Sequence, residues 1–407
     1  MRLLIIGTHP SQTTGYSKVV YNIVKQLEHY PQIECTVFGI QKFSNVNDDI
    51  RNEFPENVRI WNVVANDKED FGFGTNSLIQ FVTMYNPDVV LIYNDADVIS
   101  KYIMNLEIAR KKALEANMQL HFKIAVYLDQ VHTSLKSETI RYISENADHV
   151  FCFTEFWRQN YLKYIKSDNL RSNCSVVRHG IEILNFYQPE QDRKHKLDFG
   201  FPEDAFVFLN LNRFASKKRL DISVQAFVKL LKKMDDDRLY LYFPAIIDSD
   251  VNILLEIYYL ELQTAGLSIA KFKNNLKVGN KQLSDEDISK IYSFCEVGLN
   301  TCDGEGFGLC NYEHASYGRP QILSKVGGLT DYFNDNNSLM CIPKVVSYSL
   351  NFERGEVVSA DDVSEKMEKY YKTRSFYNKH ANIVREIPNN YKWKDEVNKM
   401  MTVLLSL

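Results

Sequence analysis

The chain has 407 residues, of which 45% are hydrophobic and 25% charged, and its formal net charge is −4 at neutral pH. This length predicts two domains, because single domains usually span about 100–200 residues. The near-balanced charge gives no electrostatic reason to expect nucleic acid or an anionic membrane as the main partner. Only a local basic patch could bind either of them.

Seven cysteines are scattered along the chain, an odd number with no C-x-x-C pair. Scattered thiols are typical of a reducing compartment, so we expect the cytoplasm. They also lack the spacing of a zinc site. No apolar stretch approaches the roughly 18–20 residues that span a bilayer. We therefore expect no transmembrane segment, and at most a peripheral contact with a membrane.

Short apolar runs alternate with helical patterns in the first half of the chain. This alternation predicts βαβ units and a doubly wound parallel sheet. The patterns between the strands that we expect to be helical include 16–30 and 77–85. The expected strands are 3–6, 35–40, 89–93, 124–128, 150–153 and 176–177.

A second alternating series follows a polar stretch at 187–204, whose two prolines indicate a connection between domains. The final stretch, 392–407, predicts an amphipathic helix. The fold class is therefore α/β with two consecutive domains of similar size, whose strand ends we expect to face a cleft. In the second series we expect strands at 206–211, 239–243, 276–278, 297–300 and 321–324 and helices at 221–234 and 288–295.

The strongest chemical signal is a glycine-rich loop at 303–308 that follows an expected strand and opens a helix. Glycines let a backbone approach a ligand closely, and a helix start offers N–H groups and a positive dipole to an anion. Two carboxylates accompany the loop, Glu305 within it and Glu313 in the helix. A diphosphate fits such a site, and the two carboxylates could accept hydrogen bonds from hydroxyl groups of the ligand on either side of the phosphates.

A basic segment at 213–219 directly follows the first expected strand of the second domain. Fixed cations at a strand end can neutralise a departing diphosphate, whose negative charge grows in the transition state. Charge runs are usually solvated turns. The position of this run favours a role for Arg213 and Lys218.

These segments together resemble the retaining GT-B glycosyltransferases, specifically glycosyltransferase family 4. The family carries two glutamates separated by seven residues, matched here by Glu305 and Glu313 around Gly306-Phe307-Gly308-Leu309. It also carries an arginine and a lysine five positions apart, matched by Arg213 and Lys218. The asparagine-, lysine- and tyrosine-rich composition suits a virus-encoded member.

The resemblance implies two Rossmann-like domains, an acceptor-binding domain at 1–187 and a nucleotide-sugar-binding domain at 188–378. A last segment, 379–407, is expected to pack back on the first domain. For the second domain the resemblance implies that Arg213 and Lys218 bind the donor diphosphate. Main-chain amides of Phe307, Gly308 and Leu309 would hold the phosphates or the transferred sugar, Glu305 would contact sugar hydroxyls, and Glu313 would contact the ribose.

For the first domain the resemblance implies that Gly15 and Tyr16, in the loop after the first strand, close over the phosphates. It also places a histidine near the donor sugar, matched by His132, with Asp129 as a rival for the same place. His9 is a weaker candidate for acceptor contact. Asp95-Ala96-Asp97 has the shape of a metal-binding pair, but its position favours a turn or helix cap.

The sequence therefore predicts an enzyme that moves a hexose from a GDP- or UDP-sugar, with GDP-mannose favoured, to a glycan or lipid-linked acceptor without a metal cofactor. A non-catalytic nucleotide-sugar-binding protein or degenerate subunit is the alternative. A dinucleotide-dependent oxidoreductase is weaker, because the first loop lacks G-x-G-x-x-G.

Overall fold

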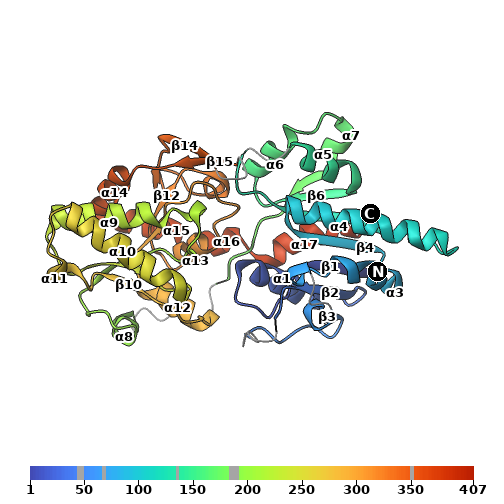
Figure 1. The fold of residues 1–407 in the computed structure, drawn as a ribbon, viewed down its shortest axis with the longest axis horizontal. Helices are drawn as coiled ribbons and strands as arrows, with labels where there is room; N and C mark the ends of the chain where they lie inside the picture. Colours follow the sequence, from blue (N-terminus) through green and yellow to red (C-terminus); the bar gives the residue numbers. More distant parts are fainter. Residues whose placement is uncertain (44–49, 67–69, 134–136, 183–191, 349–352) are drawn as a thin grey trace. The chain divides into compact units, whose positions relative to one another are not determined.

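A computed structural model describes residues 1–407 except 44–49, 67–69, 134–136, 183–191 and 349–352. The chain divides into two compact units (Figure 1). Unit 1 comprises Met1–Gly180 and Tyr391–Leu407, and unit 2 comprises Ile181–Asn390. Among the described residues, no helix is both long enough and apolar enough to cross a bilayer.

Unit 1 is built on a parallel sheet of seven strands in the order β3-β2-β1-β4-β5-β6-β7. Most of these strands are buried along nearly their whole length, as in a sheet covered on both faces. The strands are β1 (Arg2–Thr8), β2 (Glu34–Ile40), β3 (Val58–Asn62), β4 (Val89–Asp95), β5 (Lys123–Asp129), β6 (His149–Cys152) and β7 (Cys174–Val176).

Helices connect these strands, and their apolar faces form the core with the sheet. Where the sequence pattern predicted one helix at 16–30, the structure has α1 followed by a short 3-10 turn. The helices of unit 1 are α1 (Gly15–Lys25), α2 (Val63–Asn66), α3 (Thr75–Tyr85), α4 (Ala96–Glu115), α5 (Ser137–Asn146), α6 (Glu155–Leu162), α7 (Asp168–Ser172) and α17 (Trp393–Leu404).

Unit 2 repeats this design with a parallel sheet of six strands in the order β10-β9-β8-β11-β12-β13 and a separate antiparallel pair, β14-β15. The strands are β8 (Phe206–Leu209), β9 (Leu239–Phe243), β10 (Leu276–Val278), β11 (Val297–Asn300), β12 (Gln321–Ser324), β13 (Leu339–Cys341), β14 (Val345–Tyr348) and β15 (Arg354–Val357). The helices are α8 (Asp192–Asp198), α9 (Leu220–Met234), α10 (Asp248–Thr264), α11 (Ile269–Phe272), α12 (Asp285–Phe294), α13 (Leu309–Ser316), α14 (Ala360–Lys372), α15 (Arg374–Val384) and α16 (Ile387–Asn390).

Each sheet reverses its strand order at one point, between β1 and β4 in unit 1 and between β8 and β11 in unit 2. Connections leave such a point toward opposite faces, so the loops at the carboxyl ends of the two strands border a crevice where ligands bind. The two sheets therefore confirm the predicted doubly wound α/β class.

The polar stretch 187–204, which we expected to connect the domains, contains the helix α8. Residues 187–191 of this stretch lie outside the described part of the chain. The sequence of α8 resembles a linker because it is rich in charged residues. In the structure two of these residues are paired with residues of unit 2. Lys196 Nζ lies 2.5 Å from Glu296 Oε1, and Arg319 donates to Asp192 Oδ2 at 2.6 Å. The strands β3 and β13 and the hairpin β14-β15 are further elements absent from the expected series.

The chain returns to unit 1 at Tyr391, and α17 packs there. The Tyr30 hydroxyl donates to Asn398 Oδ1 at 2.9 Å, and the Arg178 N–H donates to Glu396 Oε2 at 2.9 Å. A Cβ on Gly180 would lie only 2.3 Å from the Trp393 nitrogen. By contrast, α15 stays with unit 2, where Tyr377 donates to the Glu296 carbonyl at 2.9 Å.

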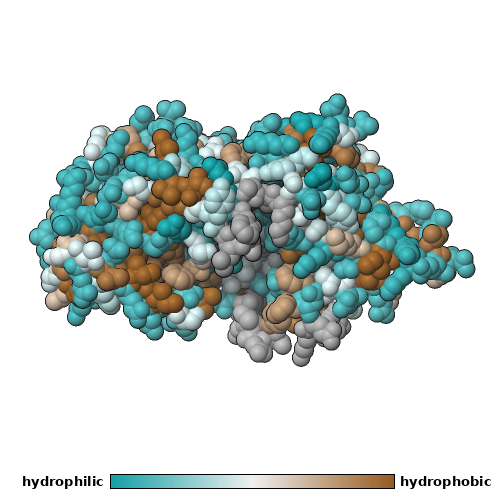
Figure 2. Space-filling model, turned by 45° about the horizontal axis from the view of Figure 1, so that its top comes forward, coloured by the Kyte–Doolittle hydropathy of each residue, from teal (hydrophilic) through white to brown (hydrophobic). Residues whose placement is uncertain are grey.

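Exposed apolar side chains occur on both units, for example Met104 and Ile108 on α4 and Ile253 and Leu260 on α10. Figure 2 shows a face on which hydrophobic residues form separate small patches among hydrophilic ones. Single exposed apolar residues are ordinary on folded proteins.

We predict that Gly180→Ala destabilises the protein by about 1–3 kcal/mol, because the added methyl group would overlap the main chain of Trp393. Urea denaturation measures this as a lower midpoint. Gly15→Ala is the matched control, since a Cβ there meets no atom within 4 Å. Equal midpoints for the two variants would contradict this account of how α17 docks.

Candidate active site

The basic segment and the glycine-rich loop lie side by side at the carboxyl edge of sheet β10-β9-β8-β11-β12-β13. β8 and β11 are hydrogen-bonded neighbours, with Gly298 paired to Leu209. The segment after β8 carries Lys218 in a 3-10 turn, Ser216–Lys218, and the loop after β11 leads into α13. The two strongest sequence signals therefore meet at the point of strand-order reversal in unit 2.

The loop requires glycine where its backbone bends or touches a neighbour. Gly308 has φ = +89° and precedes α13, and a Cβ there would lie 2.4 Å from Leu329 Cδ2. A Cβ on Gly328 would lie 2.0 Å from the Gly306 carbonyl oxygen. The loop thus packs directly on the turn at Gly327–Asp331. This packing presents the first N–H groups of α13, with the positive end of its dipole, at the edge of the site.

Lys218 and Glu305 form an ion pair at this edge. Lys218 Nζ lies 2.6 Å from Glu305 Oε2, and the two side chains are only 13% and 11% exposed. Asn300, the last residue of β11, donates from Nδ2 to the same oxygen at 3.1 Å. A charge-assisted contact in such a poorly solvated place is shorter and stronger than one at the surface.

The electrostatic balance keeps both groups charged. Burial by itself raises the pKa of Glu305, but the Lys218 ammonium and the bond from Asn300 outweigh it, so the pKa of Glu305 lies below its ordinary value. Burial lowers the pKa of Lys218, yet attraction by Glu305 prevails and that pKa is raised. A fixed cation is therefore present at neutral pH.

Glu313 lies in α13 with little exposure, and the Tyr292 hydroxyl donates to its Oε2 at 3.1 Å. Burial, and then the Glu313 charge, raise the pKa of Tyr292 well above its ordinary value, so this hydroxyl stays a donor. Arg213 follows β8 with an exposed side chain, and among the described residues it forms no ion pair. The structure thus draws Lys218 to the glycine-rich loop and leaves Arg213 at the surface.

A chain of amides beside the ion pair was not recognised in the sequence. Asn300 donates to Asn311 Oδ1 at 2.8 Å, and Asn311 donates to Gln321 Oε1 at 3.0 Å. Gln321 in turn lies over Gly298, where a Cβ would come within 2.0 Å of its Oε1. The available signal was an amide side chain at the end of β11, within α13 and at the start of β12, because a buried amide requires partners.

In unit 1 the predicted residues gather at the carboxyl edge of the other sheet. Gly15 is the first residue of α1, with Thr14 as its N-cap. The Tyr16 hydroxyl donates to Asp129 Oδ2, and its ring stacks on Tyr93 with centroids 5.0 Å apart. Burial, followed by the Asp129 charge, raises the pKa of Tyr16 well above its ordinary value.

The remaining candidates of unit 1 are also placed. His132 is buried in the loop that follows β5. His9 packs on Gly39, where a Cβ would lie 2.7 Å from its ring. Asp95 is the N-cap of α4 and accepts from the Val98 N–H at 3.0 Å, which confirms the prediction of a helix cap. In the described parts of the chain, no three His, Cys, Asp or Glu side chains group as metal ligands.

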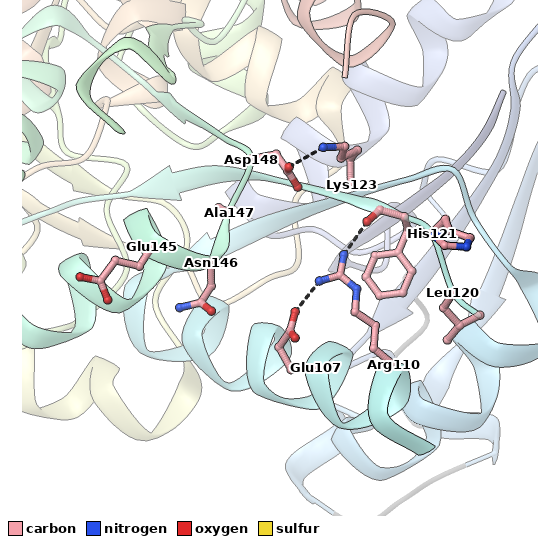
Figure 3. Close-up of a pocket in the computed structure, with 10 residues that line it drawn as sticks. Glu107, Arg110, Leu120, His121, Lys123, Glu145, Asn146, Ala147 and Asp148 are labelled. Carbon is pink, nitrogen blue, oxygen red and sulfur yellow. Dashed lines mark hydrogen bonds and ion pairs between the residues drawn. The ribbon is translucent and has the colours of Figure 1, made fainter. Parts of the chain in front are cut away.

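A surface depression of about 560 Å³ lies elsewhere in unit 1, near the amino ends of β5 and β6 (Figure 3). Four of its charged groups form two pairs: Arg110 with Glu107 at 2.5 Å, and Lys123 with Asp148 at 3.0 Å. Arg110 also donates to the Phe122 carbonyl oxygen. Ligands of doubly wound sheets bind at the opposite, carboxyl edge, so we assign this depression no part in the site.

We predict that Glu305→Gln lowers the free energy of unfolding by roughly 3 kcal/mol near pH 7, because it leaves the Lys218 charge buried without its partner. The Glu305 contribution is present above its ordinary pKa of 4.5 and is lost as pH falls through the lowered pKa. The Lys218 contribution is present below its ordinary pKa of 10.5 and is lost as pH rises through the raised pKa.

The difference between wild type and Glu305→Gln should therefore be greatest between about pH 5 and pH 10 and should shrink in acid. Urea titrations across this range measure it. Glu286→Gln breaks the exposed pair with Lys290 and should cost under about 0.5 kcal/mol. A difference that stays constant from neutral pH down to about pH 3 would argue against a charged pair.

Comparisons with known proteins find relatives of part of the chain. Residues 191–374 match the model of the family described as glycosyl transferases group 1. D-inositol 3-phosphate glycosyltransferase 2 of Catenulispora acidiphila is 26% identical over 197 residues, 48% of this chain and 44% of that relative. A D-inositol 3-phosphate glycosyltransferase of Streptomyces avermitilis is 24% identical over 184 residues, 45% of this chain and 38% of that relative. The chain thus matches less than half the length of these curated relatives.

Solved structures resemble the whole chain. Anabaena Alr3699/HepE in complex with UDP and glucose superposes with a TM-score of 0.72 at 14% identity, covering 100% of both chains. Sucrose-phosphate synthase from Thermosynechococcus elongatus gives a TM-score of 0.72 at 14% identity, covering 100% of this chain and 98% of that one. The complete chain therefore has the two-domain GT-B fold, and its residues 191–374 match the model of the glycosyl transferases group 1 family.

Proposed function

We propose that this protein is a retaining glycosyltransferase that moves a hexose from a nucleotide-diphosphate sugar to a glycan or lipid-linked acceptor. One observation carries the proposal: the buried Lys218–Glu305 pair lies beside the glycine-rich start of α13, at the strand-order reversal of a nucleotide-binding type of sheet. The family match over 191–374 and the whole-chain GT-B likeness support it.

The donor diphosphate fits the cation and helix start of unit 2. An ammonium has three N–H donors, so Lys218 can hold Glu305 with one and bind phosphate oxygens with the others. The N–H groups of Phe307, Gly308 and Leu309 would complete the phosphate site. Arg213, exposed after β8, would add its guanidinium once a phosphate is present.

The two carboxylates would flank the phosphates. Glu305, oriented by Lys218 and Asn300, would accept from hydroxyls of the transferred sugar. Glu313, oriented by Tyr292, would accept from the ribose hydroxyls. Each carboxylate is positioned before the substrate arrives, which lowers the entropic cost of ordering the site.

The reaction that we propose needs no nucleophilic side chain. The bond between the anomeric carbon and the phosphate oxygen breaks first, leaving an oxocarbenium-like sugar and a diphosphate stabilised by Lys218, Arg213 and the α13 dipole. The acceptor oxygen then bonds to the same face of the sugar, and the departing phosphate takes its proton. Because these fixed charges neutralise the leaving group, we propose that no divalent metal is needed.

Unit 1 would bind the acceptor. Gly15 and Tyr16 would approach the phosphates, and His132 would contact the donor sugar. Asp129 remains the rival for that contact. Asp129 accepts a hydrogen bond from the Tyr16 hydroxyl, so a substitution at Asp129 would also release the Tyr16 side chain.

The nucleotide base is the least constrained part of the proposed donor. Sequence reasoning favoured GDP-mannose, whereas the solved structure of Anabaena Alr3699/HepE is a complex with UDP and glucose. We therefore propose a UDP- or GDP-sugar as donor. The alternative, a non-catalytic nucleotide-sugar-binding protein, would show the same binding without release of the sugar.

We predict that Lys218→Met and Glu305→Gln each lower sugar transfer, or donor hydrolysis without acceptor, by at least about 100-fold. Lys217→Ala is the matched control, because it removes a neighbouring lysine while its carbonyl still accepts from the Asp303 N–H. Release of free nucleotide from each donor is measured at a temperature where circular dichroism shows every variant folded. Full turnover by both site variants would refute the assignment, and a wild type that binds donor without releasing nucleotide would favour the non-catalytic alternative.

We also predict that the cognate nucleoside diphosphate raises the melting temperature and that the rise persists in a chelator. A ligand that binds only the folded state at 100 times its Kd stabilises it by about 2.7 kcal/mol. A panel of UDP, GDP, ADP and their sugars, each with EDTA or Mn²⁺, measures both base preference and metal dependence. A shift seen only with Mn²⁺ would overturn the metal-independent site.

A further inference from the structure

The β14-β15 hairpin is hydrogen-bonded to the glycine-rich loop at Asp303, the first residue of that loop. The Glu356 N–H donates to the Asp303 carbonyl oxygen at 2.8 Å. On its other side the Asp303 N–H donates to the Lys217 carbonyl at 3.0 Å. One peptide segment thus connects the hairpin to the turn that carries Lys218.

This approach depends on glycine at position 355. A Cβ there would lie 2.6 Å from Asp303 Oδ2 and 2.7 Å from its Cγ. Gly355 is paired with Ser347 in the hairpin, so it lies between Ser347 and Asp303. The absence of a side chain lets β15 lie directly against the start of the loop.

The hairpin is anchored to the core through β15, whereas β14 is mostly exposed. Val357 belongs to the core of unit 2, and the Lys344 N–H donates to its carbonyl at 3.0 Å. Val345 and Tyr348 of β14 are 61% and 67% exposed. A two-stranded hairpin is marginally stable alone, so we expect this core contact to hold β15 in place.

Asp303 lies two residues before Glu305, and its N–H binds the residue before Lys218. A displacement of Asp303 therefore moves both partners of the ion pair, and a shift of about 1 Å is large for groups that must meet a phosphate. We propose that the β14-β15 hairpin is a positioning element of the donor site, holding the Lys218–Glu305 pair in register through the main chain of Asp303. This inference rests on the proposed function, because it assigns the hairpin to the same diphosphate site.

Two substitutions at position 356 separate the main-chain contact with Asp303 from the role of the Glu356 side chain. In an antiparallel pair the N–H groups alternate between the partner strand and the outside, and the Glu356 N–H points outward to Asp303. Proline at such an edge position breaks no bond within the hairpin, but its ring replaces the outward N–H and would also press on the Asp303 carbonyl oxygen, which lies 2.8 Å from this nitrogen. Glu356→Pro therefore removes the bond to Asp303, and Glu356→Ala removes the same side chain, with its ion pair to Arg354, while keeping the N–H.

We expect Glu356→Pro to weaken binding of UDP or GDP, whichever wild type binds, by about fivefold in titration calorimetry, the effect of losing one supporting hydrogen bond. Glu356→Ala should stay within about twofold of wild type. The donor KM should rise in Glu356→Pro, with a smaller change in the acceptor KM. Equal nucleotide affinity in the proline and alanine variants, both folded, would overturn the proposal.

A second pair of variants covers the case in which the proline variant does not fold. Gly355→Ala should weaken nucleotide binding because its methyl group would displace Asp303. The same change in an Asp303→Ala background should have a smaller effect, since the Oδ2 and Cγ atoms that it meets are gone. An unchanged effect would overturn the proposal. Wild type that binds neither nucleotide would instead refute the proposed function.

Discussion

The candidate site depends on one interaction, the ion pair between Lys218 and Glu305. Breaking a buried pair leaves a charge with neither water nor partner, which costs more than the pair itself contributes. The pair therefore holds two segments together that are far apart in the chain, the turn after β8 and the loop after β11. It also keeps the ammonium charged at neutral pH, as any role in binding a diphosphate requires.

The shape of the site is set by close main-chain approaches around that pair. Gly308 turns the chain with a positive φ, Gly328 lies on the Gly306 carbonyl, and Gly355 admits Asp303. Side chains at these positions would separate the segments. The Asn300 amide then donates to the carboxylate, and it is itself held by a bond to the Asn311 side-chain oxygen. The ion pair therefore depends on the backbone geometry, because the Lys218 and Glu305 side chains would not meet without the tight turns.

The two units share a strand order but use it differently. In unit 2 the strand-order reversal carries charges and glycines suited to a diphosphate. In unit 1 the same edge carries aromatic rings: Tyr16 stacks on Tyr93 and bonds Asp129, and Tyr93 contacts His179. These contacts fix the Tyr16 ring and the Asp129 carboxylate in position at that edge.

The sequence by itself determined the fold class, most strands and the Lys218, Glu305 and Glu313 candidates, because buried parallel strands are continuous apolar runs and glycine-rich loops have fixed spacing. It did not reveal α8, whose charges look like a linker until Lys196 meets Glu296, nor the hairpin against Asp303. Only the tertiary structure decided that Lys218 pairs with Glu305 while Arg213 stays exposed, and that Tyr16 binds Asp129. These outcomes depend on contacts between residues up to 113 positions apart, which no local pattern encodes.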